Sequence, residues 1–228
     1  MKLQNRVHII IPCFNEEKVI KQNIKKVLNE GYSVLVIDDG STDNSIDEIK
    51  KTNASLIRHS INLGQGAAIE TGLAYLRQIK DSFDFAITYD GDGQHSVADI
   101  AKLLKVQRKT HVNVVLGNRF GSNTKFNGGR IKEVLLKTAA RLSKVTIGVK
   151  VHDRHNGLRL FDKEAVLKIR IKESGYAHAD EILRLILEND LRYCEAEVQI
   201  LYSTYSKRKG QPLYNALNIM FDKIMVSR

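Results

Sequence analysis

Short, mostly apolar runs alternate along the first half of the chain with stretches in which apolar residues recur at helical spacing. The runs predict buried strands at 7–12, 34–37, 55–59, 83–89 and 112–116. The stretches between them predict helices from about residue 15, through 46–49, after the 62–68 segment and over 98–107. Because strands that alternate with helices are typical of parallel sheets, the pattern predicts an α/β fold.

The pattern changes after Gly121. A polar loop at 122–129 precedes a predicted helix over 131–147, a strand at 157–161, a helix near 180–187 and a strand over 195–203. The last apolar residues of the chain share one helical side. We therefore predict one domain over 1–212, followed by an amphipathic helix at 213–228 that packs on the domain or docks to a membrane or partner.

Charge and composition narrow the class of partner. The net charge of +10 implies an anionic partner: a nucleic acid, a phosphorylated substrate or a membrane face. Low aromatic content (7%), no Trp and no recognisable binding module argue against nucleic acid. No apolar run approaches the roughly 20 residues that cross a bilayer, and the first residues lack a signal-peptide core, so we expect a cytoplasmic protein.

Two carboxylates follow the fourth predicted strand, in the stretch TYDGDGQHS. Asp90 and Asp92 can present oxygens to one hard divalent cation, and the glycine after each lets the backbone turn sharply. An EF-hand calcium loop does not fit, because its glycine position holds His95 and its bidentate acid position holds Ala101. Mg²⁺ or Mn²⁺ shared with a diphosphate fits better; a solvated acidic turn is the alternative.

A second acidic strand end and a glycine-bearing loop lie upstream. Asp39 can hydrogen-bond a ribose or base, or it can cap the next helix together with Ser41 and Thr42. The segment 62–68, NLGQGAA, has glycines at a helix start, where a nucleotide or phosphate can approach closely. Since ligands of open α/β sheets bind at the carboxyl ends of the strands, we expect these motifs to converge in space.

Six motifs, in this order and at these spacings, resemble those of family 2 glycosyltransferases of the GT-A fold: IIIPCFNEE, VLVIDDGSTDNS, NLGQGAA, YDGDGQH, LGNRF and HNGLRLF. They are most similar to polyprenyl-phosphate glycosyltransferases of the dolichol-phosphate mannose synthase type. The resemblance implies a GT-A (Rossmann-like) three-layer sandwich with a mainly parallel central sheet. It also implies inverting, metal-dependent transfer of a sugar from a nucleotide donor, with UDP favoured, to a polyprenyl (undecaprenyl) phosphate for cell-envelope glycans.

The same resemblance implies roles for individual residues. Asp90, Asp92 and Gln94 would hold Mg²⁺ or Mn²⁺. Arg119 and Arg130 would face the acceptor phosphate, and Arg159 would neutralise a donor phosphate. The nucleotide pocket would be formed by Pro12, Asn15, Glu16, Asp39, Asn62, Gly64, Gln65 and Gly66.

The chemistry of the acceptor leaves a second reading open. A lipid phosphate is already ionised, whereas a sugar hydroxyl of a surface polysaccharide needs a base, for which Asp180 or Glu181 is the candidate. Both acids also suit a helix start. The alternative that is not an enzyme is a non-catalytic sugar-nucleotide or nucleic-acid binding module. Four histidines fit polar surface positions as well as catalytic ones: His95, His152, His155 and His178.

The basic stretch 207–209 either is a solvated patch or binds a lipid phosphate and anionic headgroups. Relatives of this class often carry transmembrane helices after the catalytic domain, and some depend on a separate small membrane protein. No such apolar run is present in this sequence. We therefore expect peripheral attachment to the inner face of the cell membrane, through its anionic surface or such a subunit.

Overall fold

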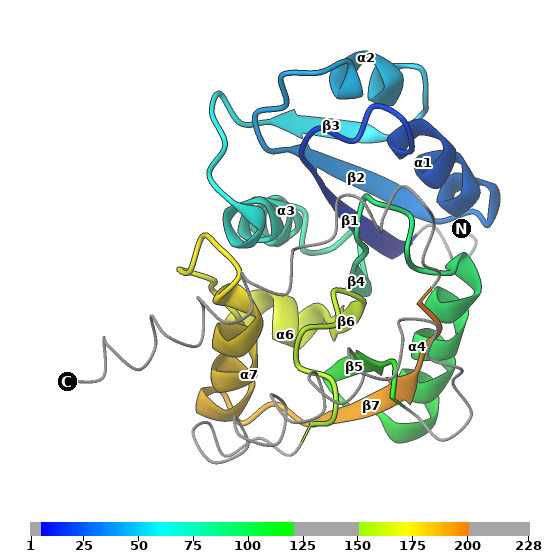
Figure 1. The fold of residues 1–228 in the computed structure, drawn as a ribbon. Helices are drawn as coiled ribbons and strands as arrows, with labels where there is room; N and C mark the ends of the chain where they lie inside the picture. Colours follow the sequence, from blue (N-terminus) through cyan, green and yellow to red (C-terminus); the bar gives the residue numbers. More distant parts are fainter. Residues whose placement is uncertain (1–5, 121–150, 201–228) are drawn as a thin grey trace.

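Residues 6–120 and 151–200, which the computed structural model describes, form one open seven-stranded sheet (Figure 1). The strand order is β3-β2-β1-β4-β6-β5-β7, and only β6 runs antiparallel to its neighbours. The predicted α/β class with a mainly parallel sheet is thus confirmed. The strands are β1 (Val7–Cys13), β2 (Ser33–Asp38), β3 (Ser55–Arg58), β4 (Phe85–Thr88), β5 (Val114–Asn118), β6 (Arg159–Asp162) and β7 (Tyr193–Glu197).

Helices cover both faces of the sheet and produce two separate apolar cores (Figure 1). One core packs α1 (Ile20–Asn29), α2 (Ser45–Lys50) and α4 (Val97–Thr110) on the sheet. The other packs α3 (Gln65–Gln78), α6 (Lys163–Lys168) and α7 (His178–Glu188) on the opposite face. Strands buried on both faces explain the nearly continuous apolar runs in the sequence.

Strand register brings the polar strand ends to one edge. In the parallel pair β1 and β2, Cys13 lies beside Asp38, and β4 runs parallel to β1 on its other side. Because β6 runs the opposite way, its first residue, Arg159, pairs with Thr88 at the end of β4 and with Leu116 near the end of β5. The antiparallel strand therefore starts where the parallel strands end.

Two helix starts differ from the prediction. α1 begins at Ile20 rather than near residue 15, because the left-handed backbone of Asn15 (φ 54°) and a tight turn precede it. Ser41 and Thr42 do not cap α2. Instead, Ser41 Oγ accepts from the Asn15 amide at 2.9 Å, and the Thr42 amide donates to Asn15 Oδ1 at 2.9 Å. These contacts join the loops that follow β1 and β2.

The sequence pattern does not predict α6. Asp162 caps this short helix by accepting a hydrogen bond from the Ala165 amide at 2.8 Å. Among residues 6–120 and 151–200, no helix is long and apolar enough to span a bilayer. Arg130, the basic stretch 207–209 and the predicted helix at 213–228 lie outside the described residues.

Candidate active site

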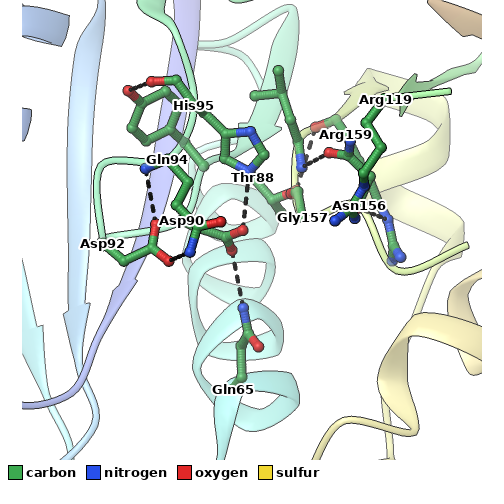
Figure 2. A network of polar contacts seen from close by, with 12 residues as sticks. Gln65, Thr88, Asp90, Asp92, Gln94, His95, Arg119, Asn156, Gly157 and Arg159 are labelled. Carbon is green, nitrogen blue, oxygen red and sulfur yellow. Dashed lines mark hydrogen bonds and ion pairs between the residues drawn. The ribbon is translucent and has the colours of Figure 1, made fainter. Parts of the chain in front are cut away.

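The acidic turn after β4 holds both predicted metal-binding carboxylates (Figure 2). Asp90 Oδ1 accepts from Gln65 Nε2 at 3.1 Å, and Asp90 Oδ2 lies 2.9 Å from His95 Nε2. Asp92 Oδ1 accepts from the Gln94 amide at 3.0 Å, and its other oxygen accepts from the Gln94 side chain. The structure therefore brings Asp90, Asp92 and Gln94 together in one turn.

Electrostatics differ between the two carboxylates. Burial, and then the negative charge of Asp90, raise the pKa of Asp92 to about 6. Burial opposes ionisation of Asp90 as well, but the hydrogen bond and charge of His95 and the charges of Arg119 and Arg159 lower the pKa of Asp90. Two close carboxylates that repel each other in this way attract a divalent cation.

The donor set fits Mg²⁺ or Mn²⁺ shared with a ligand. Carboxylate and amide oxygens are hard donors, and Mg²⁺ is usually bound through one or two carboxylates plus substrate phosphates. Within the described ranges, no group of three or more His, Cys, Asp or Glu side chains could hold a metal.

Two arginines lie beyond the acidic turn (Figure 2). Arg119, just after β5, donates from Nε to Asp153 Oδ2 at 2.6 Å. Arg159 is 3% exposed and donates to the carbonyl oxygens of Asn156 and Arg154 at 3.1 and 2.7 Å. Burial lowers the pKa of Arg159 to about 10, so it remains a cation at neutral pH. Both guanidinium groups are thus held by hydrogen bonds, and their charges act on Asp90.

Gly157 packs directly against the Asp90 carboxylate. Its carbonyl oxygen accepts from Thr88 Oγ1 at 2.6 Å, which holds the segment before β6 against β4. Any larger residue at 157 would place its Cβ 2.3 Å from Asp90 Oδ2. The sequence contained this glycine in the HNGLRLF motif, but only the fold reveals that it faces Asp90.

The Asp39 carboxylate contacts residues of the 59–64 loop. Asp39 Oδ1 lies 2.7 Å from His59 Nδ1 and accepts from the Leu63 amide at 2.9 Å, while Oδ2 accepts from the Gly64 amide at 2.8 Å. The carboxylate thus shapes the 59–64 loop beside the strand ends. Pro12, Asn15, Glu16, Asp39 and Asn62 lie in the loops and strand ends of this edge.

The close approach expected at Gly64 and Gly66 is made by another part of the chain. Ser174 O accepts from the Gly66 amide at 2.7 Å, and a Cβ at Gly66 would lie 2.0 Å from Glu173 O. A Cβ at Gly64 would lie 2.4 Å from Ser174 O. The backbone of the 173–175 segment therefore packs closely against the start of α3.

The two candidate bases have different surroundings. Glu181 is 5% exposed, and its carboxylate accepts from the amides of Lys172 and Glu173 at 3.0 and 2.8 Å. These bonds tether the same segment that covers the start of α3. Asp180 Oδ1 lies 3.8 Å from Arg154 Nη1, and the charge of Asp180 acts on Arg159. The structure therefore places Asp180 toward the arginines and gives Glu181 a tethering contact.

Two of the four histidines are buried, which excludes the surface alternative for these two. His95 and His178 are 4% and 6% exposed. His178 Nδ1 lies 2.7 Å from the Gly175 carbonyl oxygen and therefore carries the proton. His152 is exposed and contacts Glu195.

The buried imidazole of His178 should make the free energy of unfolding depend on pH. Burial, and then the charge of Arg159, lower the pKa of His178 to about 4 from an ordinary value near 6.5. Between these values the unfolded chain binds a proton that the folded chain does not, so stability falls as pH drops, by at most about 3 kcal/mol. His178→Asn keeps a donor for Gly175 O and should flatten the loss measured by denaturation between pH 7 and pH 4.5. An unchanged slope would contradict this assignment.

The sheet order, the acidic turn after β4 and the facing arginines define the GT-A class of glycosyltransferases. Residues 8–170 match the family described as Glycosyl transferase family 2, and the chain belongs to this family. The family that the six motifs indicate is thus confirmed, and the protein is an enzyme that transfers glycosyl groups. The reading as a non-catalytic binding module is therefore set aside.

The names of two relatives include a dolichyl or polyprenol lipid. The chain is 30% identical over 241 residues to UDP-N-acetylglucosamine–dolichyl-phosphate N-acetylglucosaminyltransferase of Methanococcus voltae, covering 96% of this chain and 95% of that one. It is 24% identical to polyprenol monophosphomannose synthase of Mycolicibacterium smegmatis, covering 85% and 76%. Among solved structures, glucosyl-3-phosphoglycerate synthase from Mycobacterium tuberculosis in complex with Mn²⁺ and UDP-glucose shares the fold, with a TM-score of 0.69, 17% identity and coverage of 97% and 77%.

Proposed function

We propose that this protein transfers a sugar from a nucleotide-sugar donor, most simply a UDP-sugar, to a polyprenyl phosphate, with inversion and with Mg²⁺ or Mn²⁺. The observation that carries the proposal is the acidic pair Asp90 and Asp92 beside the fixed guanidinium groups of Arg119 and Arg159. One named relative has dolichyl phosphate in its name, and the other is named as the synthase of polyprenol monophosphomannose. The UDP in the names of a relative and of a structural neighbour supports the donor.

The reaction needs negative charge to be neutralised rather than a proton to be removed. An oxygen of the lipid phosphate attacks the anomeric carbon as the bond from that carbon to the β-phosphate oxygen breaks, and the nucleoside diphosphate leaves with the bonding electrons. A bound Mg²⁺ or Mn²⁺, held by Asp90, Asp92 and Gln94, would stabilise charge on the diphosphate. Arg159, buried and preorganised, would meet the same developing charge without reorganising. Arg119 and Arg130 would bind the acceptor phosphate.

A hydroxyl acceptor remains the second candidate, because Asp180 lies near the arginines. The tether made by Glu181 argues against its use as a base. Glu181→Gln should lower the free energy of unfolding by about 1–3 kcal/mol, since the neutral amide loses the charge that strengthens the bonds from Lys172 and Glu173. If Glu181 were instead the base, kcat would drop by about 10²–10⁴-fold in the folded variant. Denaturation and kinetics of the one variant decide between these roles.

The donor is tested by release of nucleoside diphosphate from purified protein with Mn²⁺. UDP-, GDP- and dTDP-sugars would each be supplied with and without undecaprenyl phosphate in detergent. We expect release from one donor, dependent on the lipid. Release that depends on a glycan hydroxyl but not on the lipid would favour the second candidate. Repeating the panel with native membranes tests the need for a membrane-protein subunit.

The distribution of charge supports peripheral attachment to an anionic membrane. Of 36 Lys and Arg and 26 Asp and Glu, 13 basic and 2 acidic residues lie in 1–5, 121–150 and 201–228. The described residues therefore carry 23 basic against 24 acidic side chains and are close to neutral. The positive charge thus belongs to segments that include Arg130 and 207–209, and we propose that these meet the inner face of the cell membrane.

Flotation with liposomes tests this attachment. Protein should float with vesicles containing anionic lipid and remain behind with neutral vesicles. Neutralising Lys207, Arg208 and Lys209 should weaken binding by about 100-fold, because each charge near the surface contributes about 1 kcal/mol. As a control, Lys25, Lys26 and Lys50 on α1 and α2 can be neutralised together. Equal binding to neutral and anionic vesicles would contradict the proposal.

A further inference from the structure

Three neighbours fix the Asp90 carboxylate from different parts of the chain. Gln65, at the start of α3, donates to Oδ1 at 3.1 Å. His95 Nε2 lies 2.9 Å from Oδ2, and the backbone of Gly157 closes a third side, where even a Cβ would come within 2.3 Å (Figure 2). Because Asp90 can only accept hydrogen bonds when ionised, both nitrogens must carry hydrogen. The carboxylate therefore has little freedom to rotate.

His95 is itself held rigidly. Its side chain is 2% exposed, and its backbone oxygen accepts from Tyr89 Oη at 2.6 Å. The Tyr89 ring packs against the imidazole with centroids 5.6 Å apart, and an isolated bridge joins His95 to Ile200. The imidazole thus presents Nε2 to Asp90 from a fixed position.

The second ring nitrogen of His95 makes no comparable contact with the described residues. Nδ1 is buried and has no hydrogen-bond partner within 6–120 and 151–200. A buried polar atom without a partner is unfavourable, so packing alone would be served better by an apolar side chain. The histidine is therefore explained by its Nε2 contact with Asp90 rather than by core packing.

We propose that His95 is a positioning residue: its Nε2–H holds one oxygen of Asp90 so that the remaining lone pairs of the carboxylate face the metal site. This inference rests on the metal-dependent part of the proposed function. Hydrogen bonds to a metal-binding carboxylate orient it before the metal arrives, and their loss typically costs about 10–100-fold in affinity. The carboxylate then does not have to lose rotational freedom when the metal binds.

Two amide variants separate this role from packing. In His95→Gln the side-chain amide can reach the place of Nε2, whereas in His95→Asn it stands near the place of Nδ1, away from Asp90. Mn²⁺ would be titrated into each full-length protein, with and without UDP, and the free ion measured by electron paramagnetic resonance. The control is His8→Asn, because His8 is a partly buried histidine on β1 that packs on Phe83.

We expect His95→Asn to bind Mn²⁺ about 10–100-fold more weakly, and His95→Gln to recover most of the affinity. Thermal unfolding of the metal-free proteins should be similar for the two variants, since both lose the ring contact with Tyr89. Equal Mn²⁺ affinity of wild type and His95→Asn would overturn the positioning role alone. Failure of the wild type itself to bind Mn²⁺ would overturn the metal dependence as well.

Discussion

Asp92→Asn should reduce kcat/KM by about 10³-fold or more, which corresponds to about 4 kcal/mol of lost transition-state stabilisation. The substitution removes one of the two carboxylates that would hold the metal against the leaving diphosphate. Its effect on stability should have the opposite sign. Because burial and the charge of Asp90 raise the pKa of Asp92, the ionised carboxylate is unfavourable in the metal-free fold. The neutral amide should therefore fold at least as stably as the wild type.

A matched control separates this effect from a general loss of charge. Asp81 is exposed and pairs with Lys163 on the surface, so Asp81→Asn should leave kcat/KM unchanged. Initial rates and thermal unfolding of both variants, with a fixed Mn²⁺ concentration, measure the two quantities. Retention of more than about a tenth of the activity by Asp92→Asn would be incompatible with its role as a metal ligand.

Arg159→Lys should reduce kcat/KM by about 10²–10³-fold, mainly through kcat. The ammonium group keeps the charge but lacks the planar fork whose Nε and Nη2 donate to the carbonyl oxygens of Asn156 and Arg154. It would therefore approach the leaving diphosphate from a less fixed position. A loss that appears only in KM would instead indicate a role in uniform binding of the donor.

Arg77 offers a control of similar construction. Arg77 also donates to two carbonyl oxygens, those of Val166 and Ile169, but it lies on the far part of α3 from the acidic turn. Arg77→Lys should lower the free energy of unfolding while kcat stays close to that of the wild type. Equal losses of kcat in Arg77→Lys and Arg159→Lys would show that both act through stability.

The sequence predicts most of the sheet because its strands are buried on both faces. Apolar runs such as those of β1 and β2 have no other stable place in a soluble protein, and acidic residues directly after them fall on one edge. The position of Asp90 and Asp92 at this edge follows from this regularity. The antiparallel direction of β6, which brings Arg159 to the same edge, does not, because a short apolar run carries no information about its direction.

Residues of the same type at that edge have different roles, and only their tertiary contacts distinguish these roles. Asp39 resembles Asp90 as an acid at a strand end, yet three contacts with the 59–64 loop occupy its oxygens. Gly66 resembles a phosphate-binding glycine, yet its close neighbour is Glu173, more than 100 residues further along the chain. Burial of His95 likewise depends on packing against Tyr89 rather than on local pattern.

The most direct test of the central claim is mass spectrometry of the lipid after incubation of the purified protein with Mn²⁺, undecaprenyl phosphate and the donor selected by nucleoside-diphosphate release. The account predicts a phosphodiester whose mass exceeds that of the lipid phosphate by one sugar residue, and its absence with Asp92→Asn. An unmodified lipid phosphate, alongside a glycan extended by one sugar, would contradict the assignment of the acceptor.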